Sequence, residues 1–171
     1  MHTFVALLRA VNVGGTGKLP MAELRAMAEA EGFGTVRTYI QSGNLVFETD
    51  RNVEQAKRAL EARLQDHAGR PVGVVLRTAE EMSAILAANP FTDAEPSKVG
   101  VLFLEAAPPS DTRDAAKGRA DEEIALGARE VFVHYPSGMG RTKLRFPAMA
   151  AGTVRNINTV AKLADMAGGS G

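Results

Sequence analysis

The spacing of hydrophobic residues in the first half of the chain predicts a βαββαβ order of elements. The predicted strands cover residues 4–10, 36–41, 45–49 and 71–77. Each is a short apolar or alternating run between turn residues, which is typical of strands. Pro20 opens the first predicted helix, and Asn52 caps the second, with Gln55 three residues later. This order is typical of the ferredoxin-like plait, in which two helices cover one face of a four-stranded, mostly antiparallel sheet.

The second half of the chain predicts a smaller α/β lobe with a similar order of strands. Its predicted elements are a strand over residues 99–105, a short polar helix near 108–119, a hairpin over 123–126 and 131–135, and a final helix from Thr153 to about Ala167. Residues 141–146 fit either a strand or a short helix. The two halves share no evident sequence identity, so the similar order gives only a weak indication of an internal repeat.

A third helix joins the two halves. Thr78 and Glu81 form a capping box for this helix, and Asn89–Pro90 ends it. We therefore expect a ferredoxin-like lobe over residues 1–90 and a second α/β lobe over residues 91–171, which ends in the C-terminal helix. The expected fold class is α/β, of the α+β type.

The composition is that of a globular protein and excludes several kinds of site. Hydrophobic residues make up 45% and charged residues 23% of the 171 residues, which predicts a packed core. The 20 basic residues balance the 20 acidic ones, whereas a general nucleic-acid binder usually carries a basic excess. The chain has no cysteine, which excludes disulfides and thiolate metal sites. His2, His67 and His134 have no second ligand at metal-site spacing, so no metal site is expected. No cofactor is expected either.

The apolar segment at the N-terminus is interpreted as the first strand. Arg9 interrupts it and no small-residue cleavage site follows, so it does not fit a signal peptide. No apolar run approaches the ~20 residues that span a bilayer. We expect a cytoplasmic protein without a membrane partner.

Three segments, taken together, resemble a known family. They are LRAVNVGG at Leu8–Gly15, YIQSGNLVF at Tyr39–Phe47 and TVRNINT at Thr153–Thr159. In this order they are similar to the bacterial domain-of-unknown-function family 1697, DUF1697, and the resemblance covers nearly the whole chain. Ala10 stands where we would expect a glycine after the arginine. The resemblance implies a two-lobed α/β protein with a ferredoxin-like first lobe, and it implies no activity.

The first candidate site is the end of the first strand and the segment after it. A guanidinium at Arg9 can hold a carboxylate or phosphate in a bidentate manner, although pairing with Glu48 or exposure to solvent also fits. The segment that follows carries Asn12, Gly14, Gly15 and Lys18. Consecutive glycines let backbone N–H groups converge on an anion at a helix N-terminus. The pattern is not that of a Walker A loop, and a turn whose glycines serve geometry alone is the alternative.

The second candidate site is the predicted hairpin that connects the second and third strands. It carries Gln41, Ser42 and Asn44, whose amides and hydroxyl can orient a small ligand at a strand end. A tight hairpin uses the same residue types, since glycine and asparagine accept a positive φ. The structural interpretation is favoured here.

The C-terminal part of the chain supplies the remaining candidates, which are Arg141, Lys143, Arg155, Asn156 and Asn158. Arg155 and Asn158 are expected to share one helix face with Thr159 and Lys162, at i, i+3, i+4 and i+7. Together with the cations near residue 142 they would form a local basic patch. A solvated helix face is the alternative.

These candidates lead to one functional hypothesis with two alternatives. The favoured hypothesis is that an anionic small molecule, bearing phosphate or carboxylate, binds in a cleft between the two lobes. The first alternative is a nucleic-acid-associated protein that uses the local basic patch, and the second is a structural or partner-binding module. No nucleophile or general base can be named, so the sequence leaves open whether the protein is an enzyme. The oligomeric state is not indicated either.

Overall fold

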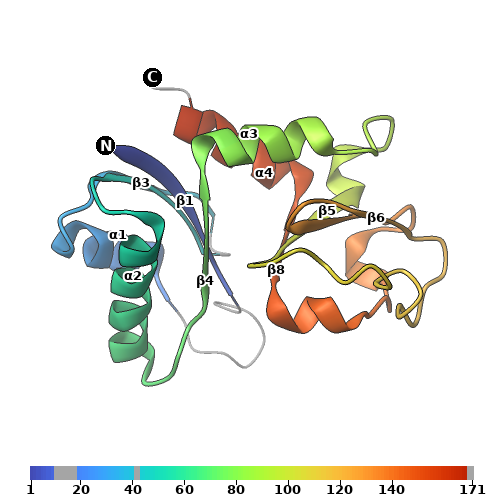
Figure 1. The fold of residues 1–171 in the computed structure, drawn as a ribbon, viewed down its shortest axis with the longest axis horizontal. Helices are drawn as coiled ribbons and strands as arrows, with labels where there is room; N and C mark the ends of the chain where they lie inside the picture. The colour runs from blue at the N-terminus through green and yellow to red at the C-terminus, as the bar shows by residue number, and fades with distance from the viewer. Residues whose placement is uncertain (10–18, 41–42, 169–171) are drawn as a thin grey trace. The chain divides into compact units, whose positions relative to one another are not determined.

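The computed structural model describes residues 1–9, 19–40 and 43–168, with the side chain of Arg141 left out. The chain divides into two compact units, Met1–Met82 with Leu163–Gly171 as unit 1 and Ser83–Lys162 as unit 2. Two helices connect them, because α3 (Ala79–Ala88) and α4 (Ile157–Gly168) each contribute residues to both units (Figure 1). The predicted lobe boundary at residue 90 stays a prediction.

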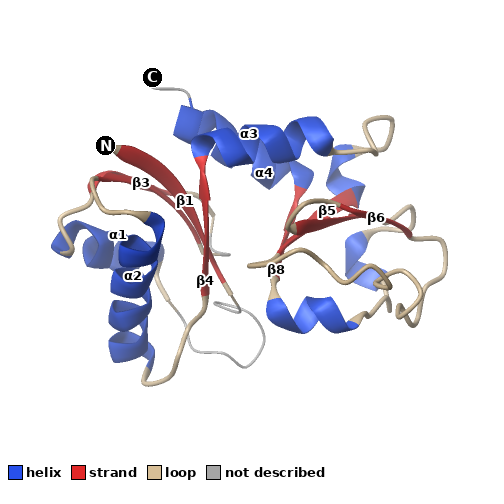
Figure 2. Ribbon diagram, viewed as in Figure 1, coloured by secondary structure: helices blue, strands red, loops and turns tan. Residues whose placement is uncertain are grey.

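Unit 1 has the βαββαβ order and the ferredoxin-like topology. Its elements are β1 (His2–Leu8), α1 (Met21–Ala30), β2 (Gly34–Thr38), β3 (Asn44–Thr49), α2 (Val53–Ala68) and β4 (Val74–Thr78). The strands form one antiparallel sheet, sheet A, in the order β2-β3-β1-β4. The sequence prediction of an α+β fold that begins with this plait is therefore confirmed (Figure 2).

The two helices of unit 1 pack on the same face of sheet A (Figure 1). The stripe of α2 that contains Leu60 and Leu64 is buried in one core with Phe4 and Phe47 of the sheet. The predicted capping box of α2 is present, because the side chains of Asn52 and Gln55 each accept a hydrogen bond from the other's backbone N–H. Capping satisfies backbone donors that the first helical turn leaves free.

Unit 2 contains a second antiparallel sheet, sheet B, in the order β6-β7-β5-β8. Its strands are β5 (Val99–Phe103), β6 (Glu123–Leu126), β7 (Glu130–His134) and β8 (Thr153–Asn156). Short 3-10 helices lie at η1 (Pro96–Lys98), η2 (Met139–Arg141) and η3 (Pro147–Ala151). Sheet B thus repeats the strand order of sheet A, with 3-10 helices and turns where sheet A has α-helices.

The predicted polar helix near residues 108–119 is wrong. The backbone N–H and hydroxyl of Thr112 both bond to the carbonyl of Pro109, at 3.1 and 2.6 Å, which makes a local turn. The chain then extends, and Lys117 forms an isolated antiparallel bridge with Arg145. The stretch between this turn and the extended pairing at Lys117 is too short for a stable helix.

The predicted start of the final helix at Thr153 is also wrong. Thr153 and Val154 are β-branched and belong to β8, where they pair with Phe103 and Leu102 of β5. The helix begins at Ile157 instead. Sheet pairing with a distant strand overrides the local capping signal that the sequence gives.

The two sheets agree in register as well as in strand order. In sheet A, Val5 of the central strand β1 lies opposite Arg77 of the edge strand β4. In sheet B, Val101 of the central strand β5 lies opposite Arg155 of the edge strand β8. Each arginine stands two residues before the start of a helix.

The backbone hydrogen bonds at the ends of the two central strands also correspond. The N–H of Leu8 donates to the carbonyl of Gly43, and the N–H of Leu104 donates to the carbonyl of Arg129, both at 2.9 Å. The internal repeat that the sequence indicates only weakly is therefore present in the structure of the two sheets.

Charged side chains tie α1, α2 and β3 together in unit 1. The carboxylate of Glu31 accepts hydrogen bonds from Arg51 Nη1 at 2.8 Å and from Arg63 Nε. The guanidinium of Arg51 also lies over the ring of Phe33, 5.3 Å from its centroid, and Phe33 stacks on Phe47. The cluster joins an ion pair to the edge of the core.

We predict that Glu31→Gln lowers the free energy of unfolding by about 1 kcal/mol at pH 7, a small effect because the arginines are partly screened by solvent. Hydrogen bonds from Arg51 and then Arg63 lower the pKa of Glu31 below 4.5. The contribution of a carboxylate with a lowered pKa is present above its unfolded pKa and is lost as the pH falls through the folded pKa. Urea unfolding at several pH values should show the deficit at pH 7 and its disappearance in acid. A deficit that does not change with pH would contradict the role of the charge.

Asn156 gives a second prediction, because its Oδ1 accepts the N–H of Thr159 at 2.9 Å and so caps α4. Asn156→Ala should lower the free energy of unfolding by about 1 kcal/mol, while Asn156→Asp should keep it, since aspartate is an equally good cap. Thermal unfolding of the three proteins measures this. Equal stability of the alanine and aspartate variants would show that the cap contributes nothing.

Candidate functional site

One end of sheet A brings together two of the predicted site residues, Arg9 and Asn44. The N–H of Leu8 donates to the carbonyl of Gly43, and the N–H of Arg9 donates to the carbonyl of Gly73, both at 2.9 Å. The end of β1 therefore lies between the start of β3 and the start of β4. We call Arg9, Gly43, Asn44 and Gly73 the Arg9 end of sheet A.

The side chain of Arg9 lies against the backbone of Gly73. A Cβ atom at position 73 would stand 2.9 Å from Arg9 Cδ and 3.5 Å from Nη1. Glycine at this position thus leaves the space that the arginine side chain occupies. Arg9 itself is half-buried, so the stem packs on protein while part of the residue is open to solvent.

Asn44 is fully buried and holds the β2–β3 hairpin together. Its Nδ2 donates to the carbonyl of Tyr39 at 2.9 Å, and the N–H of Tyr39 donates to the backbone carbonyl of Asn44 at 3.1 Å. These bonds support the structural interpretation of this asparagine. Six other candidates lie outside the described residues and stay predictions, namely Asn12, Gly14, Gly15, Lys18, Gln41 and Ser42.

The prediction that Arg155 lies on a face of the final helix is wrong. Arg155 and Asn156 belong to β8, and Thr159 is buried, while Asn158 and Lys162 are exposed on α4. The basic patch predicted along one face of the final helix is therefore not formed by these residues.

The guanidinium of Arg155 is buried in unit 2. Only 6% of the residue is exposed, and its Nη1 donates to Thr153 Oγ1 at 2.6 Å and to the carbonyl of Val154 at 3.0 Å. Burial lowers the pKa of Arg155 to about 10, because a low-dielectric environment disfavours the charged form. It remains protonated at neutral pH.

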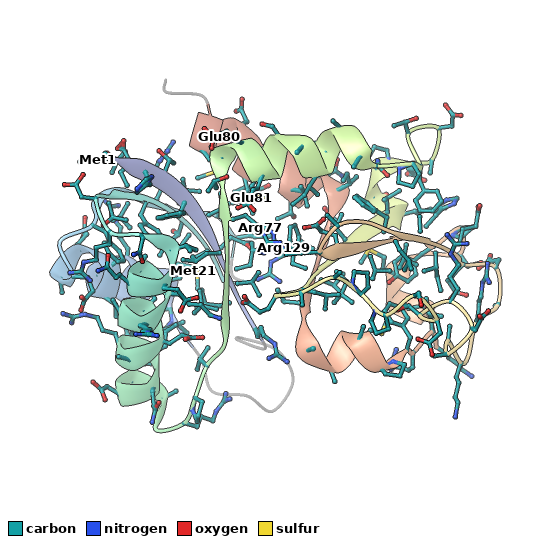
Figure 3. The ribbon with its side chains drawn as sticks, viewed as in Figure 1. Met1, Met21, Arg77, Glu80, Glu81 and Arg129 are labelled. Carbon is teal, nitrogen blue, oxygen red and sulfur yellow. The ribbon has the colours of Figure 1, made fainter. Side chains whose placement is uncertain are left out.

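Arg77 is the counterpart of Arg155 in unit 1, and sequence reasoning missed it. It is 1% exposed on β4, and its Nη1 donates to the carbonyl of Leu76 at 3.1 Å (Figure 3). Both arginines thus donate to the carbonyl of the residue before them. The sequence does hold a signal, since Arg77–Thr78 and Arg155–Asn156 each combine an arginine with a capping residue, but only the strand register shows that the two are equivalent.

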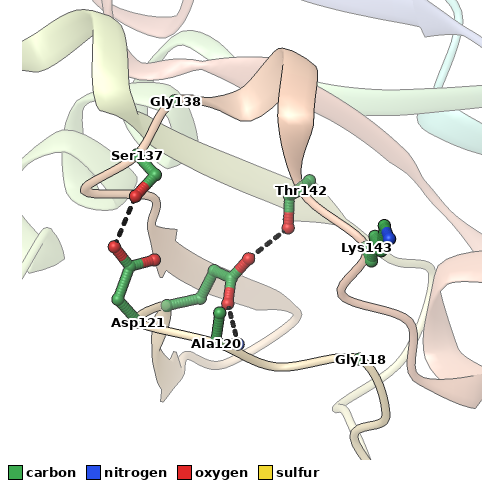
Figure 4. A pocket seen from close by; sticks show the side chains of 8 residues that line it. Gly118, Ala120, Asp121, Ser137, Gly138, Thr142 and Lys143 are labelled. Carbon is green, nitrogen blue, oxygen red and sulfur yellow. Dashed lines mark hydrogen bonds between the residues drawn. The ribbon is translucent and has the colours of Figure 1, made fainter.

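Unit 2 has a small pocket of about 150 Å³, and several polar residues line it (Figure 4). Its lining consists of Gly118, Ala120, Asp121, Glu122, Ser137, Gly138, Thr142 and Lys143. Ser137 Oγ donates to Asp121 Oδ2 at 2.6 Å, and Glu122 accepts from the hydroxyl of Thr142 and, at 2.6 Å, from the N–H of Ala120. The polar groups therefore largely bond to one another.

The charges of this pocket do not favour an anion. The hydroxyl of Thr142 and then the N–H of Ala120 lower the pKa of Glu122, so it is ionised at neutral pH. Asp121 adds a second carboxylate, and Lys143 is the one cation among the lining residues. The predicted role of Lys143 in anion binding gains no support from this surrounding, and that of Arg141 stays a prediction.

The described residues offer no site for a metal or a membrane span. They contain no group of three histidine, aspartate or glutamate side chains that could hold a metal ion. None of the helices in the described ranges is long and apolar enough to cross a membrane.

Comparisons with known proteins place the chain in a family without an assigned activity. No curated protein matches it. A solved structure, the conserved bacterial protein SP0830 from Streptococcus pneumoniae, is 26% identical, with a TM-score of 0.79 over 96% of this chain and 98% of that chain. The family model described as "Protein of unknown function (DUF1697)" matches residues 1–132. The resemblance seen in the sequence is confirmed, and the chain belongs to the DUF1697 family.

Proposed function

We propose that the protein binds a small molecule bearing phosphate or carboxylate at the Arg9 end of sheet A. The observation that carries the proposal is the meeting of three strand ends there, through the bonds of Leu8 to Gly43 and of Arg9 to Gly73. Strand ends present polar groups from different parts of the chain at one place, which is a common origin of small-molecule sites.

Arg9 is the residue that would hold the anion. A guanidinium presents its donors in a planar fork that matches a carboxylate or phosphate. The contact of the Arg9 stem with Gly73, together with the hydrogen bond from the backbone N–H of Arg9, fixes the position from which the guanidinium extends. In the sequence, Arg9 is followed by Gly14, Gly15 and Lys18, which are residue types that bind anions through backbone N–H groups and charge.

The candidates of unit 2 support this location less well. Arg155 is buried and donates to its own strand, and Lys143 lines a pocket that two carboxylates also line. A ligand cleft shared by both units stays a prediction. The proposal therefore relies on residues of unit 1 alone.

We predict that Arg9→Ala weakens the binding of inorganic phosphate by about 10- to 100-fold, since a hydrogen bond to a charged group contributes about 1.5–3 kcal/mol. Isothermal titration calorimetry with phosphate at low salt measures the affinity. Arg58→Ala is the matched control, because Arg58 is an exposed arginine on α2. An equal loss in both variants would indicate a nonspecific charge effect and would remove the support for this site, as would an unchanged affinity in Arg9→Ala.

A second prediction tests the position of Arg9 and keeps its charge. Gly73→Ala places a methyl group 2.9 Å from Arg9 Cδ, so the side chain has to move, and phosphate should bind more weakly than to the wild type. Gly34→Ala is the control, because a Cβ there meets only ordinary contact at 4.0 Å. Wild-type affinity in Gly73→Ala would show that the observed position of Arg9 is not the one that binds.

A further inference from the structure

The edge strand β2 has a β-branched residue in the left-handed region near each end. Thr35 has φ 46° and Ile40 has φ 49°. For L-residues this region brings Cβ close to the following carbonyl oxygen, and a β-branched residue there is a genuine outlier. Such strain persists where something offsets it, and it often marks a functional position.

The conformation of Thr35 has an explanation within the fold. The pairing of β2 with β3 shifts register between Gly34 and Arg37. This shift is a β-bulge, and bulges place a residue outside the ordinary extended conformation. Thr35 therefore serves the geometry of the strand.

Among the described residues, no register shift of this kind accounts for the conformation of Ile40. Ile40 is 49% exposed, so the side chain does not bury enough surface to offset the strain of its backbone. Gly43, in the same turn, has φ 87° and is the residue type that this region normally takes. Glycine or asparagine at position 40 would meet the same backbone requirement at lower cost.

Ile40 belongs to the turn that adjoins the Arg9 end of sheet A. The turn is closed by the bond from Tyr39 N–H to the Asn44 carbonyl at 3.1 Å, and its Gly43 carbonyl accepts the N–H of Leu8, the residue before Arg9. Ile40 follows the end of β2 and Arg9 follows the end of β1, so both lie at the same end of sheet A, with β3 between their strands.

We infer that Ile40 is a specificity-determining residue for an anion that also carries an apolar group, such as an aromatic or aliphatic phosphate ester or carboxylate. This inference rests on the proposed function, since the anionic group is the part that Arg9 binds. The strained, exposed isoleucine provides an apolar contact for this group, and asparagine or glycine at position 40 would not provide it.

The test compares phenyl phosphate with methyl phosphate, which share the phosphate monoester and differ in the apolar group. Calorimetry should show that the wild type binds phenyl phosphate roughly tenfold more tightly. Ile40→Asn should bind both esters equally and, without ligand, should unfold roughly 2–4 °C higher because the strain is relieved. Thr35→Asn is the matched control, with the same substituted residue type at the bulge, and should keep the preference for phenyl phosphate.

The possible results separate this inference from the function it rests on. If the wild type binds both esters equally, the role of Ile40 is overturned while the anion site stands. If neither ester binds, the proposed function fails and this inference fails with it. A lower unfolding temperature of Ile40→Asn would show that the isoleucine stabilises the fold, which overturns the inference. Loss of the preference for phenyl phosphate in Thr35→Asn would show that the effect is not specific to position 40, and it overturns the inference as well.

Discussion

The antiparallel pairing of β1 with β3 on one side and β4 on the other is the constraint on which unit 1 depends. The strand is buried on both faces from Phe4 to Leu8, so it accepts no charged side chain along that length. Arg9 stands at the first position after this run, where the stem can pack and the charge can reach water. The same pairing that builds the core thereby places a guanidinium at the junction of three strand ends.

The structure of the two sheets shows what the internal repeat preserves. Strand order, register and an arginine on the edge strand recur, whereas α1 and α2 have no helical counterpart of similar length between the strands of sheet B. Burying a guanidinium is costly unless its donors are bonded. Arg77 and Arg155 meet this requirement partly in the same way, through the carbonyl of the preceding residue. A buried arginine at the same register position of both sheets, with the same backbone acceptor for its guanidinium, is stronger evidence of a repeat than element order alone.

Local patterns in the sequence were sufficient for the elements whose stability is local. The capping boxes at Asn52 and Thr78 and the β6–β7 hairpin appear where the sequence places them, because each depends on residues a few positions apart. The start of α4 was missed because Thr153 and Val154 pair with β5, some fifty residues away in the sequence. The turn at Thr112 was missed for a similar reason, since the bridge from Lys117 to Arg145 is not visible in the local pattern.

The candidate site was predictable in part. Arg9 was found because an arginine at the end of an apolar strand is unusual. Gly73, which lies against Arg9 in the structure, was not found, because nothing near Gly73 in the sequence connects it to Arg9. Arg77 was missed because a single arginine in a strand of mixed character gives no signal until its register is known. Ile40 was placed within the predicted strand over residues 36–41, because residue type alone does not reveal a left-handed backbone. In each case the missing information is the pairing of the strands or a backbone dihedral angle. Neither can be inferred from the residues nearby in the sequence.

The division of α4 has a consequence for biosynthesis. Unit 1 consists of the first 82 residues and a return segment that starts at Leu163, whereas unit 2 is continuous in the sequence. The guanidinium of Arg37 on β2 donates to the carbonyl of Met166 at 2.7 Å, across 129 positions of the sequence. On the ribosome, unit 2 has all its residues before the return segment of unit 1 is made, so β2 can form this hydrogen bond only after Met166 has been added.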